Sequence, residues 1–398
     1  MARMSVWLTN NGHNVIVIVK SGGPAESLFS NKVLVVRLGE LFDDLKSGLL
    51  WQSPNSNRNL ACLTALDLIY AFSSDSLWLA ANLKAGLDSN AMLLAGAYNP
   101  WEYATTNPFL RIKSPGCEIF RRFLPPAARL FMSEAVKSSI EARCGELIEG
   151  MIWPLPVDGD RYRSSKHAPE RGTLVSIGTL CDFKSYNLYM LDVMRGLLDR
   201  GIEVRWSVYG EGPLKEKMER RISDLNLHQH VKLEGALAYD DMARVLGKAW
   251  VFIGMGTSLV EAGFCSVPSI PAIANTAKPL SYGYLYDLPG YAVGEELSRP
   301  WVSIDGLLER LLNLDEKEYK AEEERTLAHV QRFDMDPIMQ RFVKIGTDSG
   351  VQMRQAHLCR VSMFTAFSNR CYISLRRCVD KLQEGLCSVG RAWRDRRS

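Results

Sequence analysis

Short β-branched runs alternate with amphipathic stretches along the chain. This alternation is typical of βα units, in which helices connect parallel strands. Residues 76–86 and 185–199 are predicted to be helices, the second because its leucines and methionine recur at helical spacing. The ten predicted strands are residues 15–19, 33–37, 66–72, 91–95, 130–132, 174–177, 203–209, 231–234, 251–254 and 267–271. The pattern therefore predicts an α/β protein with parallel sheets.

A cluster of prolines and glycines over residues 153–173 separates two α/β blocks. Because this composition is typical of a linker, we expect one domain over 1–155 and a second over 156–335. Residues 336–398 are predicted to form a crossover helix and a basic tail. A charged run over 315–325 is predicted to be a helix with a solvated face.

Composition narrows the class of protein. With 46% apolar and 23% charged residues among 398, the chain can bury a sizeable core, which excludes a disordered or disulfide-scaffold protein. Its nine cysteines form no Cys-x-x-Cys pair and are expected to be reduced thiols in a cytoplasmic protein. The chain has no apolar run of about 18 residues, so we expect no membrane-spanning helix.

Positive charge is concentrated at the C-terminus. Residues 351–398 hold ten Lys and Arg against three Asp and Glu, a net +7, which leaves −4 for the rest of a chain whose total is +3. We interpret this tail, with the mixed basic and apolar segments 109–113 and 119–124, as a peripheral contact with an anionic membrane surface. A disordered tail, a domain-packing helix and non-specific attraction to nucleic acid are the alternatives. The −4 of the body argues against specific nucleic-acid binding.

Two segments at predicted strand ends have features of phosphate-binding turns. Gly178 follows one strand and precedes Lys184, whose charge and adjoining helix N-terminus favour a diphosphate. Gly210 and Gly212 follow the next strand and precede another helix. Each segment, taken alone, is also an ordinary turn.

A third segment follows the predicted strand 251–254. Gly256 precedes Thr257 and Ser258, which are candidate helix caps, so backbone amides are expected to point beyond the end of the strand. Glu261 lies one helical turn further on the same face. Its carboxylate suits the two hydroxyls of a ribose, whereas a solvent-facing helix glutamate is the simpler alternative.

In order and spacing, these segments resemble the nucleotide-sugar-binding half of retaining GT-B glycosyltransferases, in particular the glycosyl transferase group 1 (GT4) family. The resemblance covers residues 174–271 well and the first half loosely. It also rests on Glu261-Ala262-Gly263 followed by Ser266-Val267-Pro268. It implies a GT-B fold, in which two Rossmann-like α/β/α domains face each other across a cleft.

Carried over by position, the resemblance implies that Gly178 and Lys184 meet the donor diphosphate and that Glu261 holds the ribose. Backbone over 233–237 would lie against the nucleobase. The donor-binding residues that it implies are Gly178, Thr179, Lys184, Gly210, Gly212, Gly256, Thr257, Ser258 and Glu261.

The sequence departs from the family pattern at two positions. Thr179 stands where the family has a phosphate-binding arginine, so Lys184 acts more nearly alone. The first glutamate of the family's pair falls on Ile253. The second departure bears on mechanism more than on fold.

The first block starts inside the helix that usually follows its first strand and glycine-rich loop. We expect either that the true start lies upstream or that the protein is a shortened variant. Polar residues that follow two of its strands are expected to reach the cleft: Tyr70, Ser73, Ser74, Asp75, Tyr98, Asn99 and Glu102. Glu102 is predicted to be catalytic through hydrogen bonds to the donor sugar or an acceptor hydroxyl; a loop residue in water is the alternative.

The sequence thus predicts a retaining glycosyltransferase with Glu102 and Lys184 as catalytic residues. Its donor would be a UDP- or GDP-sugar, and its acceptor a glycan or polyprenyl-linked molecule in surface polysaccharide biosynthesis. We expect no cofactor, and no metal because no Asp-x-Asp motif ends a predicted strand. The alternative is a non-catalytic subunit that keeps the fold and binds the sugar nucleotide.

Overall fold

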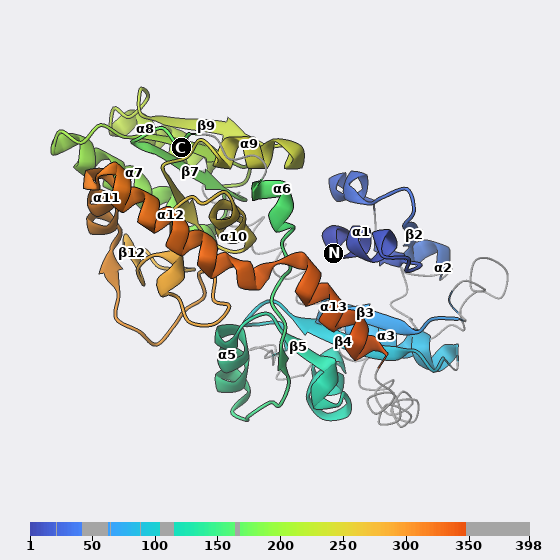
Figure 1. Ribbon diagram of the computed structural model, residues 1–398. Helices are drawn as coiled ribbons and strands as arrows, with labels where there is room; N and C mark the ends of the chain where they lie inside the picture. Colours follow the sequence, from blue (N-terminus) through green and yellow to red (C-terminus); the bar gives the residue numbers. More distant parts are fainter. Residues whose placement is uncertain are drawn as a thin grey trace, which may run out of the picture. The chain divides into compact units, whose positions relative to one another are not determined.

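The computed structural model describes residues 1–20, 22–41, 63, 65–87, 89–103, 115–163 and 168–347. The described chain forms two compact α/β units with parallel sheets (Figure 1). The first unit comprises Met1–Met132, Val136–Trp153 and the chain from Gln340, and the second comprises Ser133–Ala135 and Pro154–Met339. The predicted fold class is therefore confirmed.

The first unit holds two separate parallel sheets. The larger has the order β3 (Leu68–Ala71), β4 (Met92–Ala97), β5 (Arg129–Phe131), β6 (Met151–Ile152). The smaller pairs β1 (Ile16–Val19) with β2 (Leu34–Arg37). Because β1 and β3 share no hydrogen bonds, the sheet of this unit is interrupted within the described residues.

Helix α3 (Ser74–Gly86) contacts both sheets of the first unit. It packs on β3 and β4, while its Leu83 belongs to a buried cluster with Val36 of β2, and its Leu79 packs against that cluster. The helix begins where it does because Ser73 and Ser76 form a reciprocal capping box. The other described helical segments are α1 (Ala2–Asn10), α2 (Leu38–Leu41), α4 (Pro115–Glu118), α5 (Glu134–Cys144), the 3-10 turns Pro24–Leu28 and Pro126–Ala128, and the π turn Ile119–Phe123.

The second unit is built on one continuous five-stranded parallel sheet. Its order is β11 (Ser269–Pro271), β10 (Val251–Gly254), β7 (Thr173–Ile177), β8 (Arg205–Tyr209), β9 (Val231–Gly235). The chain runs from β7 outward to β9 and then returns to the other side of β7 as β10. The direction of the chain therefore reverses between β7 and β10, and such a switch point leaves a crevice at the carboxyl ends of the strands.

Helices surround this sheet because each carries an apolar face. The longest buried face belongs to α7 (Tyr186–Asp199), with Met190, Met194 and Leu197 fully buried. The remaining elements of this unit are α6 (Gly159–Arg163), α8 (Lys215–Asp224), α9 (Met242–Leu246), α10 (Thr257–Phe264), α11 (Ile304–Asn313), α12 (Glu316–Val330), the antiparallel pair β12 (Leu280–Ser281) and β13 (Val302–Ser303), and the 3-10 turns Asp182–Lys184, Tyr239–Asp241, Leu285–Asp287 and Gln331–Phe333. Helix α13 (Met335–Gly346) begins in the second unit and belongs to the first unit from Gln340 onward.

All ten predicted strands exist, with ends that differ by at most two residues. The two units divide between Trp153 and Pro154, within the proline-rich segment 153–173, but this segment is packed: Trp153, Val157 and Tyr162 are fully buried, and α6 lies within it. The helix predicted over 315–325 is confirmed, but its face is only partly solvated: Glu322 is buried and paired with Arg310.

Candidate functional site

Three glycine turns of the second unit meet at the carboxyl edge of its sheet. The Gly178 amide donates to the Tyr209 carbonyl at 2.9 Å, and the Gly210 amide donates to the Gly235 carbonyl at 2.7 Å. Each turn follows one of the adjacent strands β7, β8 and β9. The structure thus brings together turns that are far apart in the sequence.

Gly210 and Gly212 make this close approach sterically feasible. Both have positive φ angles, +149° and +153°. A Cβ atom at Gly210 would overlap the Gly178 carbonyl oxygen, and one at Gly212 would overlap the Leu180 carbonyl oxygen. The structure assigns both glycines a packing role, whereas their contact with a donor stays a prediction.

Lys184 ends the 3-10 turn between β7 and α7. Its ammonium lies against the Gly178 backbone, since a Cβ atom there would collide with Lys184 Nζ. It forms no ion pair with any described residue, and burial lowers its pKa, an effect that Cys181 partly opposes. This partly desolvated cation lies at the start of a 14-residue helix and favours an anionic ligand. Burial has removed part of the water that stabilises the ammonium charge, and a bound anion would replace that stabilisation.

The turn after β10 lies on the other side of the switch point. Gly256 has a φ of +77° and precedes α10, but its amide already donates to the Val293 carbonyl at 2.7 Å. The Ser258 hydroxyl donates to the Met255 carbonyl. The groups of this turn that are still predicted to face a ligand are therefore the Thr257 hydroxyl and the backbone amides of the first turn of α10.

Glu261 is 1% exposed on α10, so the alternative of a solvent-facing glutamate is wrong. Its carboxylate lies near Cys265: burial, with a smaller contribution from Glu261, raises the pKa of that thiol to about 12. Lys184 and Glu261 thus belong to elements that flank the same switch point, one after β7 and one after β10. Direct contact of either side chain with a donor stays a prediction.

The two departures from the family pattern have different structural settings. Ile253 is fully buried in β10 and belongs to the core of the unit, so this position cannot present a carboxylate to a sugar without disrupting the core. Thr179 is exposed in the turn after β7. A longer side chain would be accommodated there, but the threonine leaves that turn with less positive charge.

Four of the polar residues predicted for the first unit form hydrogen bonds with one another. Glu102 Oε1 accepts a hydrogen bond of 2.6 Å from the Ser74 amide, which caps the first turn of α3. The hydroxyls of Tyr70 and Tyr98 share a hydrogen bond, and burial raises the pKa of both groups. Glu102 therefore has a structural role, and its catalytic role stays a prediction.

Phe183 was missed by sequence reasoning. Its ring is half-exposed, with its centroid 5.9 Å from Lys184 Nζ. A large apolar side chain between Asp182 and Lys184 was the signal, because such a residue in a polar turn has no helix or strand to bury it.

The segments predicted to contact a membrane are only partly described. Residues 109–113 and 348–398 lie outside the described residues. Within 119–124, Phe120 is buried, and Arg121 and Arg122 pair with Glu146 and Glu118. None of the described helices is both long and apolar enough to cross a membrane. The described residues also contain no group of three or more His, Cys, Asp or Glu side chains placed to hold a metal ion.

The comparisons with known proteins agree with this architecture. Residues 160–277 match the family described as glycosyl transferases group 1. No curated protein sequence matches the chain. Because the family match covers the switch point and the turns after β7, β8, β9 and β10, it coincides with the candidate site.

Several solved structures have a similar fold at low sequence identity. Sucrose-phosphate synthase from Thermosynechococcus elongatus has a TM-score of 0.60 at 14% identity, over 86% of this chain and 90% of that one. A glycosyltransferase from Rickettsia africae has a TM-score of 0.58 at 12% identity, over 87% and 93%. WaaG, a glycosyltransferase involved in lipopolysaccharide biosynthesis, has a TM-score of 0.55 at 12% identity, over 87% and 95%.

Some structures of this fold are much longer, and the chain spans only 51% and 57% of the length of two TarM structures. The match in fold nevertheless extends over both α/β units, and the sequence match lies in the second. The chain therefore has the GT-B fold, and its residues 160–277 match the family described as glycosyl transferases group 1.

Proposed function

We propose that the chain is a retaining, GT4-like hexosyltransferase that uses a UDP- or GDP-sugar. Its acceptor is a glycan or a polyprenyl-linked molecule, and its setting is surface polysaccharide biosynthesis at the cytoplasmic face of the membrane. The observation that carries this proposal is the unpaired, partly desolvated Lys184 ammonium against Gly178, at the switch point of a parallel sheet.

In this reaction the bond between the sugar C1 and the diphosphate oxygen breaks, and its electron pair leaves with the diphosphate. Lys184 and the amides at the start of α7 stabilise the negative charge that develops there. The acceptor hydroxyl then forms the new bond to C1 and gives its proton to an oxygen of the departing diphosphate. Charge stabilisation of this kind is worth about 2–4 kcal/mol for one well-placed donor.

A second group positions the donor. Glu261 is buried one turn into α10, on the opposite side of the switch point from Lys184. A carboxylate that accepts hydrogen bonds from both ribose hydroxyls would fix the nucleoside while Lys184 holds the diphosphate. We expect Glu261 to affect mainly the affinity for the donor, and Lys184 to affect both this affinity and the rate of transfer.

The experiment measures UDP and GDP affinity by calorimetry for the wild-type chain, Lys184→Ala and Glu261→Gln. We expect each substitution to weaken binding about tenfold or more, which corresponds to roughly 1.4 kcal/mol. Lys248→Ala is the matched control, because Lys248 is exposed before β10 and lies outside the site. Unchanged affinity in both site variants would contradict the proposal.

A second candidate function is supported by Ile253 and Thr179. Since one family carboxylate position is a core residue here and one cation is absent, a subunit that binds a sugar nucleotide without turnover is the alternative. Assays of transfer and hydrolysis with UDP- and GDP-sugars separate the two. Nucleotide binding without turnover across acceptors would favour the non-catalytic subunit, whereas transfer with retained anomeric configuration would favour the enzyme.

A further inference from the structure

Residues 293–295 of the second unit form hydrogen bonds with the chain that follows two neighbouring strands of its sheet. The Val293 carbonyl accepts a hydrogen bond of 2.7 Å from the Gly256 amide, in the turn after β10. The Gly294 carbonyl accepts one of 3.2 Å from the Ala274 amide, in the chain after β11. The 293–295 segment therefore joins the turn after β10 to the chain after β11.

Gly294 allows this segment to approach both neighbours closely. A Cβ atom at this position would lie 2.7 Å from the Ala272 carbonyl oxygen and 2.8 Å from Met255 Cβ. Both distances are shorter than real contacts of a Cβ atom, so the packing requires a residue without a side chain. The hydrogen bonds of the segment are thus supported by tight packing.

The Glu295 carboxylate holds the segment in place. Its Oε2 accepts a hydrogen bond of 2.6 Å from the Val293 amide, and its Oε1 accepts one of 2.7 Å from the Ser133 hydroxyl. Ser133 is fully buried directly before α5, and Ser133–Ala135 belongs to the second unit. Each oxygen of this acceptor-only group thus has a donor, and hydrogen bonds to an ionised carboxylate are stronger than those between neutral groups.

The residue after Ser133 anchors the start of the same loop. Glu134 Oε2 accepts a hydrogen bond of 3.2 Å from the Tyr291 amide. A Cβ atom at Gly290 would overlap the Glu134 carboxylate, so the loop passes close to this side chain. Two consecutive residues at the start of α5 therefore hold both ends of the loop 290–295.

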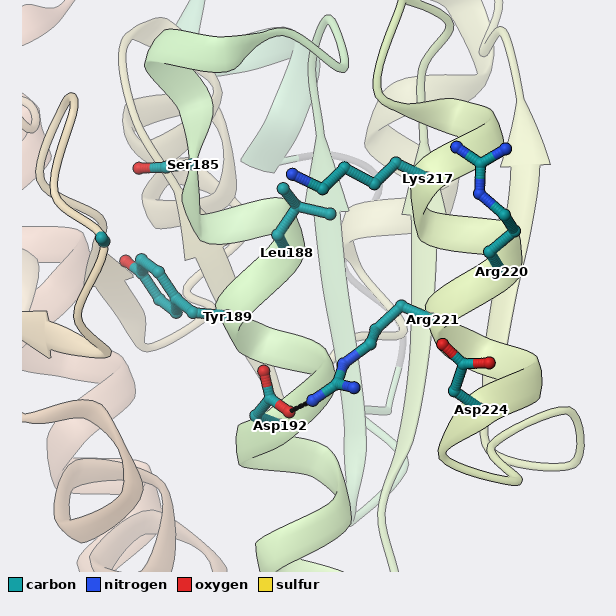
Figure 2. A pocket seen from close by; sticks show the side chains of 9 residues that line it. Ser185, Leu188, Tyr189, Asp192, Lys217, Arg220, Arg221 and Asp224 are labelled. Atoms are coloured by element: carbon teal, nitrogen blue, oxygen red, sulfur yellow. Dashed lines mark hydrogen bonds and ion pairs between the residues drawn. The ribbon is translucent and has the colours of Figure 1, made fainter. Parts of the chain in front are cut away.

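The chain after β11 extends the connection to the turn that carries Lys184. The Asn275 amide donates to the Phe183 carbonyl at 2.9 Å, and the Ser185 hydroxyl donates to the Thr276 carbonyl. Figure 2 shows Ser185 at the start of α7, on the side of that helix away from α8. Since Phe183 and Ser185 flank Lys184, the chain is held on both sides of this lysine.

These contacts lie beyond the sheet itself. The pairing of β7 with β10 reaches Val175 and Phe252 and ends before the turns that carry Lys184 and Gly256. Contacts outside the strands must therefore hold the two turns relative to each other. The hydrogen bonds from Glu295 through the 293–295 segment to both turns provide such contacts.

We propose that Glu295 is a positioning residue for donor binding, anchored by Ser133. Through Val293 it fixes the Gly256 turn, and through Gly294 and the chain after β11 it fixes the Lys184 turn. The inference rests on the proposed function, because it assigns both turns to one bound donor.

Nucleotide affinity of the full chain tests this role at the site. Glu295→Ala should weaken binding of UDP or GDP, whichever the wild-type chain binds, about tenfold, because both turns lose their support. Glu295→Gln should recover most of the affinity, since its side-chain carbonyl can accept from the Val293 amide and its NH₂ group can donate to the Ser133 hydroxyl.

The matched control is Glu296→Ala, which removes the neighbouring, exposed glutamate and should leave the affinity unchanged. Wild-type affinity in Glu295→Ala, or an equal loss in Glu296→Ala, would overturn the proposal. A loss in Glu295→Gln as large as in Glu295→Ala would assign the effect to charge and would contradict the hydrogen-bonding role.

Ser133→Ala tests the anchor. Glu295 keeps its hydrogen bond to the Val293 amide in this variant, so we expect a smaller loss of affinity, about threefold. The double variant with Glu295→Ala should bind no more weakly than Glu295→Ala alone, because both substitutions interrupt the same series of hydrogen bonds. Additive losses would contradict that connection.

Hydrogen exchange of the ligand-free chain separates this proposal from the proposed function. Glu295→Ala should speed amide exchange in 255–259 and, to a lesser extent, in 182–186, whereas Glu296→Ala should change neither segment. Binding of neither UDP nor GDP by the wild-type chain would contradict the donor function, and the exchange data would then decide alone whether Glu295 holds the turns. Unchanged exchange in both segments, or equally faster exchange throughout the second unit, would overturn the positioning role.

Discussion

The two α/β units differ in what they leave unpaired at the carboxyl edges of their sheets. In the first unit, Glu102 caps Ser74 and Tyr70 bonds Tyr98, so polar groups beyond β3 and β4 satisfy one another. In the second unit, glycine turns pack tightly and leave Lys184 partly buried without an ion pair among the described residues. The difference leaves the Lys184 ammonium available in the second unit, and its contact with a ligand stays a prediction.

The sheets of the two units also differ, because one is continuous and the other is interrupted within the described residues. The second unit has five continuous strands with a switch point, whereas the described strands of the first unit form a four-stranded and a two-stranded sheet. A continuous sheet fixes the ends of β7 and β10 relative to each other through shared hydrogen bonds. We expect the second unit to be the more rigid platform for binding.

Substitution of Gly210 should have the largest effect on this comparison. In Gly210→Ala the new Cβ would push the Gly178 carbonyl away, and the residue would also have to adopt a φ of +149°. Backbone strain and lost inter-turn hydrogen bonds should cost about 3–5 kcal/mol, measured by chemical denaturation. Gly306→Ala is the control, because no atom lies within 4 Å of its added Cβ and alanine favours a helix. Similar stability in both variants would show that the turns are not packed as described.

Acid should destabilise the second unit through His329. Burial, with a smaller contribution from Arg332, lowers the pKa of this histidine from 6.5 to about 4. The unfolded state therefore binds the proton more readily, and stability is lost as the pH falls from about 6.5 through 4, by up to ~3 kcal/mol. Unfolding measured from pH 7 to pH 4 should show this loss in the wild-type chain and a smaller loss in His329→Leu. Parallel pH profiles would rule out His329 as the source.

Removal of the Glu102 cap should have the smallest effect. Glu102→Ala should lower stability by about 1 kcal/mol, because the Ser74 amide loses its acceptor. Hydrogen exchange should localise the loss to the start of α3. Once a transferase assay exists, a change in stability alone supports the capping role, whereas a large fall in kcat with unchanged stability would support the catalytic prediction.

Sequence reasoning predicted the strands and the glycine turns well because both depend on local patterns. The alternation of apolar runs located β7 to β11, and the turns after β7 and β8 carried their glycines in the sequence itself. Sequence reasoning failed where burial is decided by tertiary packing. Prolines and glycines around Val157 indicated a linker, yet the segment packs into the second unit and bonds with Phe333 and Met335.

The candidate site shows the same limit. The sequence placed Glu261 in the helix after the predicted strand 251–254, but only the fold shows that it is buried and that the Gly256 amide is already used.

Hydrogen exchange on the full chain with and without saturating UDP or GDP tests the central claim most directly. If the switch point grips the nucleotide, one of these ligands should slow amide exchange both in 178–189 after β7 and in 257–262 of α10, while α3 of the first unit changes less. No protection in either segment at saturation, or protection confined to the first unit, would contradict the account.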